Sequence, residues 1–134
     1  TALAAHWFSP NTAVWAAEPQ NVDDAYRSLL SGRIETNDRT DTIADGLRTN
    51  LGDINFPIIK ELVGKVLVVS EEEIVGAMWW IWERMKIIIE PSSAVAVAAV
   101  IHYKEEMKGK RVGVIISGGN ADARALAREM KSEK

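Results

Sequence analysis

Three short apolar runs, separated by segments with helical spacing, most constrain how this chain can fold. The runs are "TAVWAAEP" at residues 12–19, "KVLVV" at residues 65–69 and "RVGVII" at residues 111–116. Each run is apolar on both faces, as is typical of strands that helices cover on both sides of a parallel sheet. The alternation of these strands with helices predicts an α/β fold in three layers, with a mainly parallel sheet and flanking helices.

The segments between the runs carry signals for where helices begin and end. Ser70 and Glu73 form a Ser-x-x-Glu capping box ahead of apolar residues at helical spacing. Gly32 stands where a glycine commonly ends a helix. Residues 92–102 are almost all Ala and Val, so we expect a deeply buried helix there. Asn120 is placed to cap a last helix after the third strand.

Charge and composition exclude several classes of function. The net charge is −3 over 134 residues, without the basic stripe that neutralises the phosphates of nucleic acid. No apolar run approaches the roughly 20 residues of a membrane-spanning helix. The chain contains no cysteine, which excludes disulfides and thiolate chemistry and favours a cytoplasmic location. We therefore expect a domain that binds neither nucleic acid nor membrane.

A Ser-Gly-Gly-Asn loop follows the third apolar run at residues 117–120. In parallel α/β sheets ligands bind at the carboxyl ends of the strands. Glycines there let the backbone approach a ligand closely, and the Ser117 hydroxyl can donate or accept a hydrogen bond. The alternative is a plain glycine-containing turn into a capped helix. The dinucleotide and phosphate-loop glycine motifs are both absent.

Two further groups of carboxylates follow apolar runs. Glu18 ends the first run, and Asp23 and Asp24 follow in the next helical turn, an oxygen-rich set that suits Mg²⁺ or Ca²⁺. The alternative is that both aspartates only favour a helix N-terminus through its dipole. Glu90 ends the run "KIIIE" and is either a buried acid that needs a partner or a solvated loop residue.

Four stretches together resemble one enzyme family: "AEPQNVDDAYRS", "TIADGLRTNLGD", "WERMKIIIEPSSAVAVAAV" and "VGVIISGGNAD". In this order and spacing they are similar to the C-terminal half of the serine racemase and threonine (serine) dehydratase family. These are pyridoxal-phosphate enzymes of fold type II, with a large domain like that of tryptophan synthase β. The resemblance implies that residues 1–134 are the C-terminal part of this large cofactor-binding domain.

The same resemblance implies that the small domain and the Schiff-base lysine lie upstream of Thr1. No catalytic residue is then expected within this chain, and the chain alone should not catalyse. Its expected partners are the complementary N-terminal half of the enzyme and a small amino-acid substrate. The complete enzyme is expected to be a homodimer.

The resemblance also assigns cofactor-binding residues. Ser117 would hydrogen-bond the pyridine nitrogen of pyridoxal phosphate. A hydroxyl does not enforce a protonated ring, so the cofactor would be a weaker electron sink than it is beside an aspartate. Gly46 and Glu90 would line the cofactor ring, and Gly118 and Asn120 would belong to the same loop as Ser117.

Two further sites are implied only by this resemblance. Glu18, Asp24 and the carbonyl of Val22 would hold a structural Mg²⁺ or Ca²⁺ ion. Lys86 and Asn120 would lie near a nucleotide, because animal racemases bind ATP at a subunit interface.

The implied reaction is racemisation of a β-hydroxy amino acid, or β-elimination from it to a keto acid and ammonia. A dedicated threonine or 3-hydroxyaspartate ammonia-lyase is the alternative within this family. A non-catalytic half-domain interaction module is the alternative of another class, motivated by the missing lysine.

Overall fold

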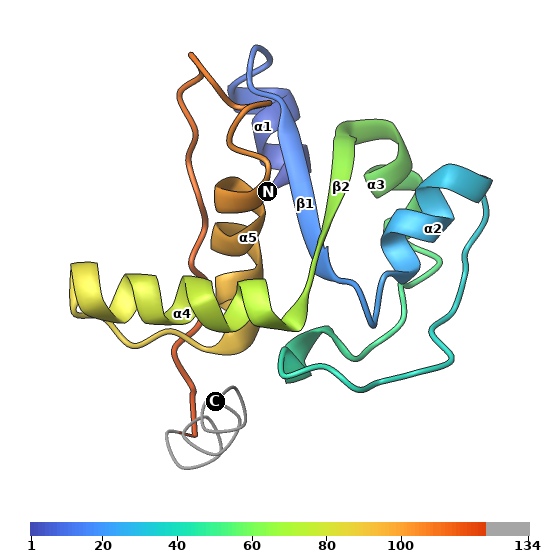
Figure 1. Ribbon diagram of the computed structural model, residues 1–134. Coiled ribbons are helices and arrows are strands. Elements are labelled where there is room, and N and C mark those ends of the chain that lie inside the picture. Colours follow the sequence, from blue (N-terminus) through green and yellow to red (C-terminus); the bar gives the residue numbers. More distant parts are fainter. Residues whose placement is uncertain (123–134) are drawn as a thin grey trace.

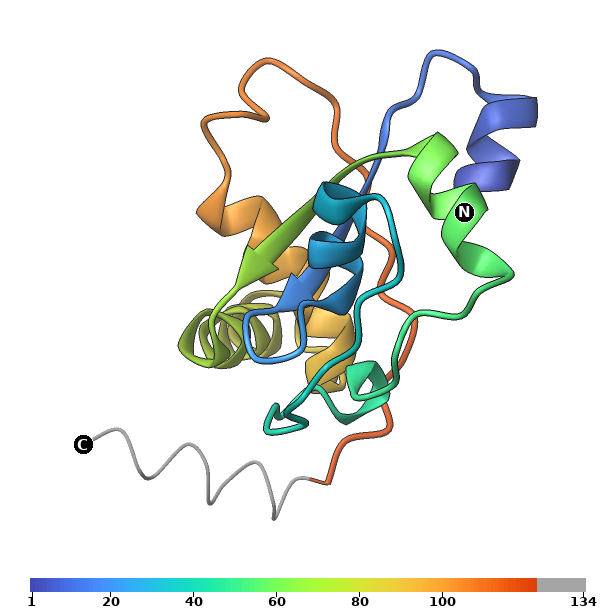
Figure 2. The ribbon, with the colours of Figure 1, turned by 90° about the vertical axis from the view of Figure 1, so that its right-hand side faces the viewer.

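The computed structural model describes residues 1–122 of the chain (Figures 1 and 2). A 3₁₀ turn, η1, follows α2, and the other elements are α-helices and β-strands. In chain order they are α1 (Ala2–Phe8), β1 (Val14–Pro19), α2 (Asp24–Ser31), η1 (Asp45–Leu47), α3 (Asn55–Leu62), β2 (Val63–Val69), α4 (Glu71–Met85) and α5 (Pro91–His102).

β1 and β2 form a parallel two-stranded sheet between layers of helices. The register pairs Trp15 with Lys65 and Pro19 with Val69, with an irregularity after Val14. In Figure 1 the sheet lies between α5 on one side and α2 and α3 on the other. The predicted α/β architecture with flanking helices and parallel strands is confirmed. Within residues 1–122, β1 pairs with a neighbour on one side only.

The core lies where α4 and α5 pack against each other and against the sheet. Its largest fully buried side chains include Ile74, Ile81, Ile89 and Val95. The capping box that starts α4 is present: the Ser70 hydroxyl accepts from the Glu73 N–H, and the Glu73 carboxylate accepts from the Ser70 N–H. Small Ala and Val side chains let α5 approach α4 and the sheet closely, and the helix is deeply buried, as predicted.

The predicted third strand at residues 111–116 is wrong. This segment is extended but forms no ladder with β1 or β2. Val112, Val114 and Ile115 are 46%, 38% and 60% exposed, and only Ile116 of the apolar side chains packs on the core. A strand needs the backbone groups of a neighbouring strand as hydrogen-bond partners. The described part of the chain does not bring such a neighbour beside this segment.

The last predicted helix lies outside the described residues. Asn120, its predicted cap, is exposed and belongs to neither a helix nor a strand. Among the described residues, no helix is both long enough and apolar enough to cross a membrane.

Candidate functional site

The predicted cofactor residues meet at the carboxyl edge of the sheet. β1 and β2 run parallel and therefore end at the same edge. The first turn of α5, η1 and the end of the segment that carries Ser117 also lie at this edge, in the lower part of Figure 1. In parallel sheets this is the edge where ligands bind.

Hydrogen bonds fix the loop at Ser117 and Gly118 to the first turn of α5. The Glu90 N–H donates to the Gly118 carbonyl over 3.1 Å, and the Gly118 N–H donates to the Ser93 hydroxyl over 2.8 Å. The hydroxyls of Ser93 and Ser117 are 3.4 Å apart. The Ser117 side chain itself is exposed at the surface. The fold thus holds the backbone of this loop firmly, and the Ser117 hydroxyl lies on the α5 side of a residue that is exposed at the surface.

Gly46 and Gly118 approach the same helix turn closely. The Gly46 N–H donates to the Ser92 hydroxyl over 3.0 Å, and a Cβ at Gly46 would lie 2.9 Å from that oxygen. A Cβ at Gly118 would lie 2.6 Å from Oε1 of Glu90. At either position an added Cβ would force the Ser92 or the Glu90 side chain to move. Gly46, Glu90, Ser117 and Gly118, four of the five predicted cofactor residues, are brought together around the start of α5.

Glu18 occupies the acidic position at the end of β1. Its carboxylate accepts the N–H groups of Ala25 at 3.3 Å and of Tyr26 at 2.9 Å, and so satisfies backbone donors at the start of α2. Burial raises the pKa of Glu18 to about 7, assisted by the nearby charges of Asp24 and Asp23 and opposed by the two backbone donors. The carboxylate is therefore protonated far more readily than an ordinary glutamate.

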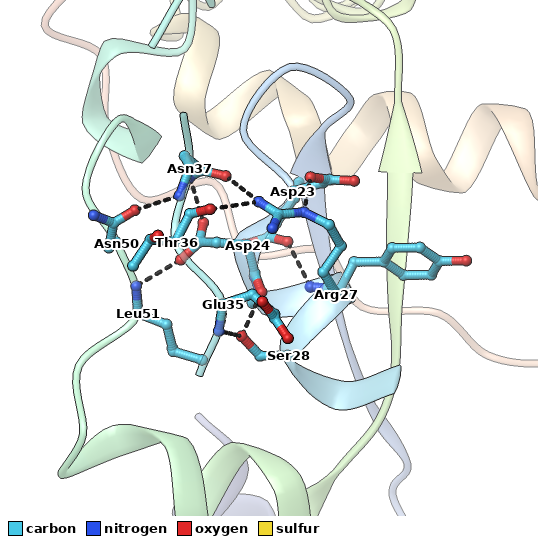
Figure 3. Close-up of polar contacts among 12 residues, drawn as sticks. Asp23, Asp24, Arg27, Ser28, Glu35, Thr36, Asn37, Asn50 and Leu51 are labelled. Atoms are coloured by element: carbon cyan, nitrogen blue, oxygen red, sulfur yellow. Dashed lines mark hydrogen bonds and ion pairs between the residues drawn. The ribbon is translucent and has the colours of Figure 1, made fainter. Parts of the chain in front are cut away.

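Asp24 ties α2 to the following loop, as Figure 3 shows. It is 3% exposed and lines the same cavity as Glu18. Oδ1 accepts from the Asn37 amide over 2.7 Å, and Oδ2 accepts from the Leu51 N–H over 2.6 Å. Asn37 in turn donates its N–H to the Asn50 side chain over 2.9 Å. Asp24 thus connects both ends of the loop, residues 33–53, that carries η1.

The donors around Glu18 and Asp24 are compatible with a hard cation. The two carboxylates line a cavity of about 230 Å³ together with residues of the 47–55 segment. Val22 is 1% exposed, and its carbonyl accepts no backbone hydrogen bond from the described residues. Within residues 1–122, however, no group of three or more His, Cys, Asp or Glu side chains is arranged so that it could hold a metal ion by itself. A cation here would need the Val22 carbonyl and water to complete its coordination.

Residues 1–118 match the model of the family described as "Pyridoxal-phosphate dependent enzyme". The chain belongs to this family. A serine racemase from Dictyostelium discoideum is 51% identical over 132 residues, which are 96% of this chain and 41% of that protein. A β-hydroxyaspartate dehydratase from Paracoccus denitrificans is 45% identical over 91% of this chain and 39% of that protein.

A solved structure of a relative shows the same fold. The structure of maize serine racemase superposes with a TM-score of 0.87 at 39% identity, over 98% of this chain and 41% of that one. The chain therefore spans about two fifths of the length of the relatives it matches. Pyridoxal phosphate is the cofactor of this family.

The two residues predicted to lie near a nucleotide are not brought together by any contact among the described residues. Lys86 ends α4 in a left-handed conformation with φ 59°, and its ammonium donates to the Glu83 carbonyl over 2.7 Å. Asn120 is exposed. The nucleotide site stays a prediction.

The sequence prediction missed the buried hydroxyl of Ser93 and the amides of Asn37 and Asn50. Ser93 stands at a predicted helix start, where serine is common, but a serine among Ala and Val side chains also signals a specific partner. The two asparagines lie in a polar loop, where nothing in the spacing shows which of them reaches Asp24.

Proposed function

We propose that this chain holds the pyridine end of pyridoxal phosphate in an enzyme that acts on β-hydroxy amino acids. The observation that supports this most directly is the attachment of Ser117 and Gly118 to the start of α5, beside Gly46 and Glu90. η1, the start of α5 and the segment that carries Ser117 lie at the carboxyl edge of the sheet, and the family uses this cofactor.

The residues present fit the cofactor. When bound, pyridoxal phosphate supplies an electron sink for the α-carbon of an amino acid. Ser117 would donate its hydroxyl hydrogen to the pyridine nitrogen, and Glu90 and Gly46 would line the ring. A neutral hydroxyl does not hold a proton on that nitrogen as an aspartate does. The cofactor beside Ser117 would therefore be a weaker electron sink. This suits loss of a β-hydroxyl, or racemisation through a short-lived carbanion.

We also propose that the remaining parts of the active site come from the share of the family fold that this chain does not span. They would include the lysine that anchors the cofactor and the glycine loop for its phosphate. Residues 1–134 would then be the C-terminal part of the large domain, and the complete enzyme would be a dimer. The exposed indole of Trp80, 49% accessible on α4, is a candidate contact with another subunit.

The decisive experiment mixes this chain with the complementary part of the family fold and pyridoxal phosphate. We expect visible absorbance from bound cofactor and release of a keto acid and ammonia from serine. Ser117→Ala in the same mixture should weaken both. A soluble, associated pair that binds no cofactor would contradict the proposal and favour the non-catalytic interaction module.

A panel of substrates separates the reactions within the family. Serine of both configurations, threonine and 3-hydroxyaspartate should be compared by turnover and by the configuration of recovered substrate. The identity of 45% to a β-hydroxyaspartate dehydratase makes 3-hydroxyaspartate the second candidate substrate. If 3-hydroxyaspartate alone is turned over, the proposed activity changes from serine racemase/dehydratase to a dedicated ammonia-lyase.

A structural divalent cation at Glu18, Asp24 and the Val22 carbonyl is the second part of the proposal. A cation would relieve the mutual repulsion that contributes to the raised pKa of Glu18. Chelation should lower the melting temperature of the assembled protein, and Asp24→Asn should abolish that response. An unchanged response in the variant would leave these carboxylates as partners of the α2 N-terminus only.

A further inference from the structure

Ser93 is a buried hydroxyl in an otherwise apolar helix. It is 2% exposed, and its neighbours on α5 include the buried residues Ala94, Val95 and Ala98. Burying a hydroxyl without a hydrogen-bond partner is unfavourable, because the group loses its contacts with water. A serine at this position is therefore stable only because its partners lie outside the helix.

Those partners are Ser117 and Gly118. The Gly118 N–H donates to the Ser93 hydroxyl over 2.8 Å, and the Ser117 hydroxyl lies 3.4 Å from it. The usual alternative role of such a serine, capping the helix, is not observed. The N-cap residue of α5 is Glu90, and the helix start has no side-chain cap. The hydroxyl of Ser93 thus serves the loop and not the helix.

The donors and acceptors around Ser93 favour one direction for the Ser93–Ser117 contact, in which either hydroxyl could be the donor. Because Ser93 accepts from the Gly118 N–H, its own hydrogen is available for a further acceptor, and the Ser117 oxygen is in reach. A Ser117 oxygen that accepts from Ser93 directs its own hydrogen away from α5. Because Ser117 is an exposed residue, its hydroxyl hydrogen is then available to an acceptor on another molecule.

We propose that Ser93 is a positioning residue that makes Ser117 a hydrogen-bond donor to the pyridine nitrogen of the cofactor. This rests on the proposed function, which places that nitrogen in front of Ser117. Ser93 acts through Ser117 and Gly118. It fixes the loop backbone through the Gly118 N–H and sets the direction of the Ser117 hydrogen. Its hydroxyl would therefore tune the electronics of a ring that it does not touch.

The test uses the intact protein that contains this chain, loaded with pyridoxal phosphate. Four variants are compared: Ser93→Ala, Ser93→Thr, Ser117→Ala and the double Ser93→Ala/Ser117→Ala. Ser28→Ala is the matched control, since Ser28 is also fully buried and also accepts a backbone N–H, from Glu35 over 2.8 Å. The readouts are the dissociation constant of the cofactor, the pH dependence of its visible absorbance, and the melting temperature without cofactor.

Loss of the Ser93 hydroxyl should raise the dissociation constant about fivefold, the effect of one hydrogen bond of about 1 kcal/mol. It should also move the pH midpoint of the absorbance in the same direction as Ser117→Ala does. Ser93→Thr keeps the hydroxyl and should restore both values. In the Ser117→Ala background, removal of the Ser93 hydroxyl should have less than half of its effect on the absorbance.

Each other outcome has a defined meaning. If Ser93→Ala lowers only the melting temperature, as Ser28→Ala should, Ser93 has a structural role and the inference is wrong. The inference is also wrong if Ser93→Ala shifts the absorbance midpoint by its full amount in the Ser117→Ala background. If Ser93→Ala does not fold, Ser93→Cys replaces it and should shift the absorbance midpoint part of the way, and no shift contradicts the inference. If Ser117→Ala itself changes neither affinity nor absorbance, the proposed function fails and not the Ser93 inference alone.

Discussion

The carboxyl edge of the sheet carries two polar regions that are built differently. In the acidic region, formed by Glu18, Asp24 and the 33–53 loop, every carboxylate oxygen of these two acids accepts a donor from the same chain. In the serine region, formed by Ser93, Ser117 and Gly118 at the start of α5, Ser117 is exposed, and among the described residues its hydroxyl has only the 3.4 Å hydrogen-bond contact with Ser93.

This difference shows which properties each region controls. The acidic region has most of its partners within residues 1–122, so changes there should appear first in the stability of the fold. The serine region holds its backbone firmly but leaves its functional hydroxyl for another molecule. Changes there should appear first in the binding of the cofactor. Substitutions in each region, with matched controls nearby, can test this division.

Asp24→Ala should have the largest effect on stability. It removes the acceptor for the Leu51 N–H and the Asn37 amide, and each unsatisfied buried donor costs about 1–3 kcal/mol. We expect a loss of about 3 kcal/mol in the free energy of unfolding, measured by urea denaturation. Asp41→Ala is the control in the same loop, because Asp41 pairs with Arg39 at the solvent-exposed surface and should change the stability much less than Asp24 does. Equal losses in both variants would contradict the division.

The acidic region should also make stability depend on pH. The pKa of Glu18 is raised in the folded chain from an ordinary value of 4.5 to about 7, so the folded state binds this proton more tightly than the unfolded state. The stability that Glu18 contributes is therefore fully present below pH 4.5 and is lost as the pH rises from 4.5 to about 7. After a discount for partial exposure the loss is about 1–2 kcal/mol.

Thermal melts of the metal-free protein between about pH 5 and 8 measure this loss. Glu18→Gln should flatten the decrease, because the amide carries no titrating proton. Glu72→Gln is a control on an exposed carboxylate at the start of α4, and it should leave the decrease in place. If the melting temperature of the Glu18→Gln variant still falls with rising pH as steeply as that of the parent, another group is responsible for the decrease.

Gly118→Ala should affect the cofactor more than the fold. The added methyl would lie 2.5 Å from Cδ of Glu90, so either the Glu90 side chain or the loop must shift. The Glu90 carboxylate is the free end of a flexible side chain, so its shift costs the fold little, but it moves a residue proposed to line the ring. A cost of about 1.4 kcal/mol in binding would weaken the cofactor about tenfold. Gly113→Ala in the same segment is the control, since nothing lies within 4 Å of its Cβ. If Gly118→Ala keeps a normal affinity for the cofactor but has a much lower melting temperature, the serine region controls stability and the division is wrong.

Lys86→Gly should have the smallest effect and gives a baseline outside both regions. Lys86 is the only residue other than glycine with positive φ among the described residues, and it ends α4 by donating its N–H to the Trp82 carbonyl. Glycine adopts this conformation without strain, so we expect a gain of up to about 1 kcal/mol, seen as a higher melting temperature. A lower melting temperature would mean that the Lys86 side chain contributes more than its backbone strain costs.

Local signals predicted the helices and the two paired strands well. The capping box at Ser70 and Glu73 and the left-handed Gly32 after α2 are both found where the sequence places them. These features depend on residues a few positions apart, so one sequence is enough to identify them. The grouping of Gly46 and Glu90 in one site was available only from the resemblance to the family.

Features that depend on distant neighbours could not be predicted in the same way. Residues 111–116 have the composition of a strand, but a ladder requires a second strand beside them, and apolar composition does not supply one. The contact of Ser93 with Ser117 joins residues 24 positions apart. The raised pKa of Glu18 depends on its burial, which spacing along the chain does not reveal.

The single pairing partner of β1 within residues 1–122 has a practical consequence for work with the chain by itself. Along its other flank, the amide and carbonyl groups of residues 14–19 can recruit an extended segment from a second molecule. Concentrated samples should consequently lose material to intermolecular sheet growth, and co-expression with a protein that caps this flank should raise the soluble yield.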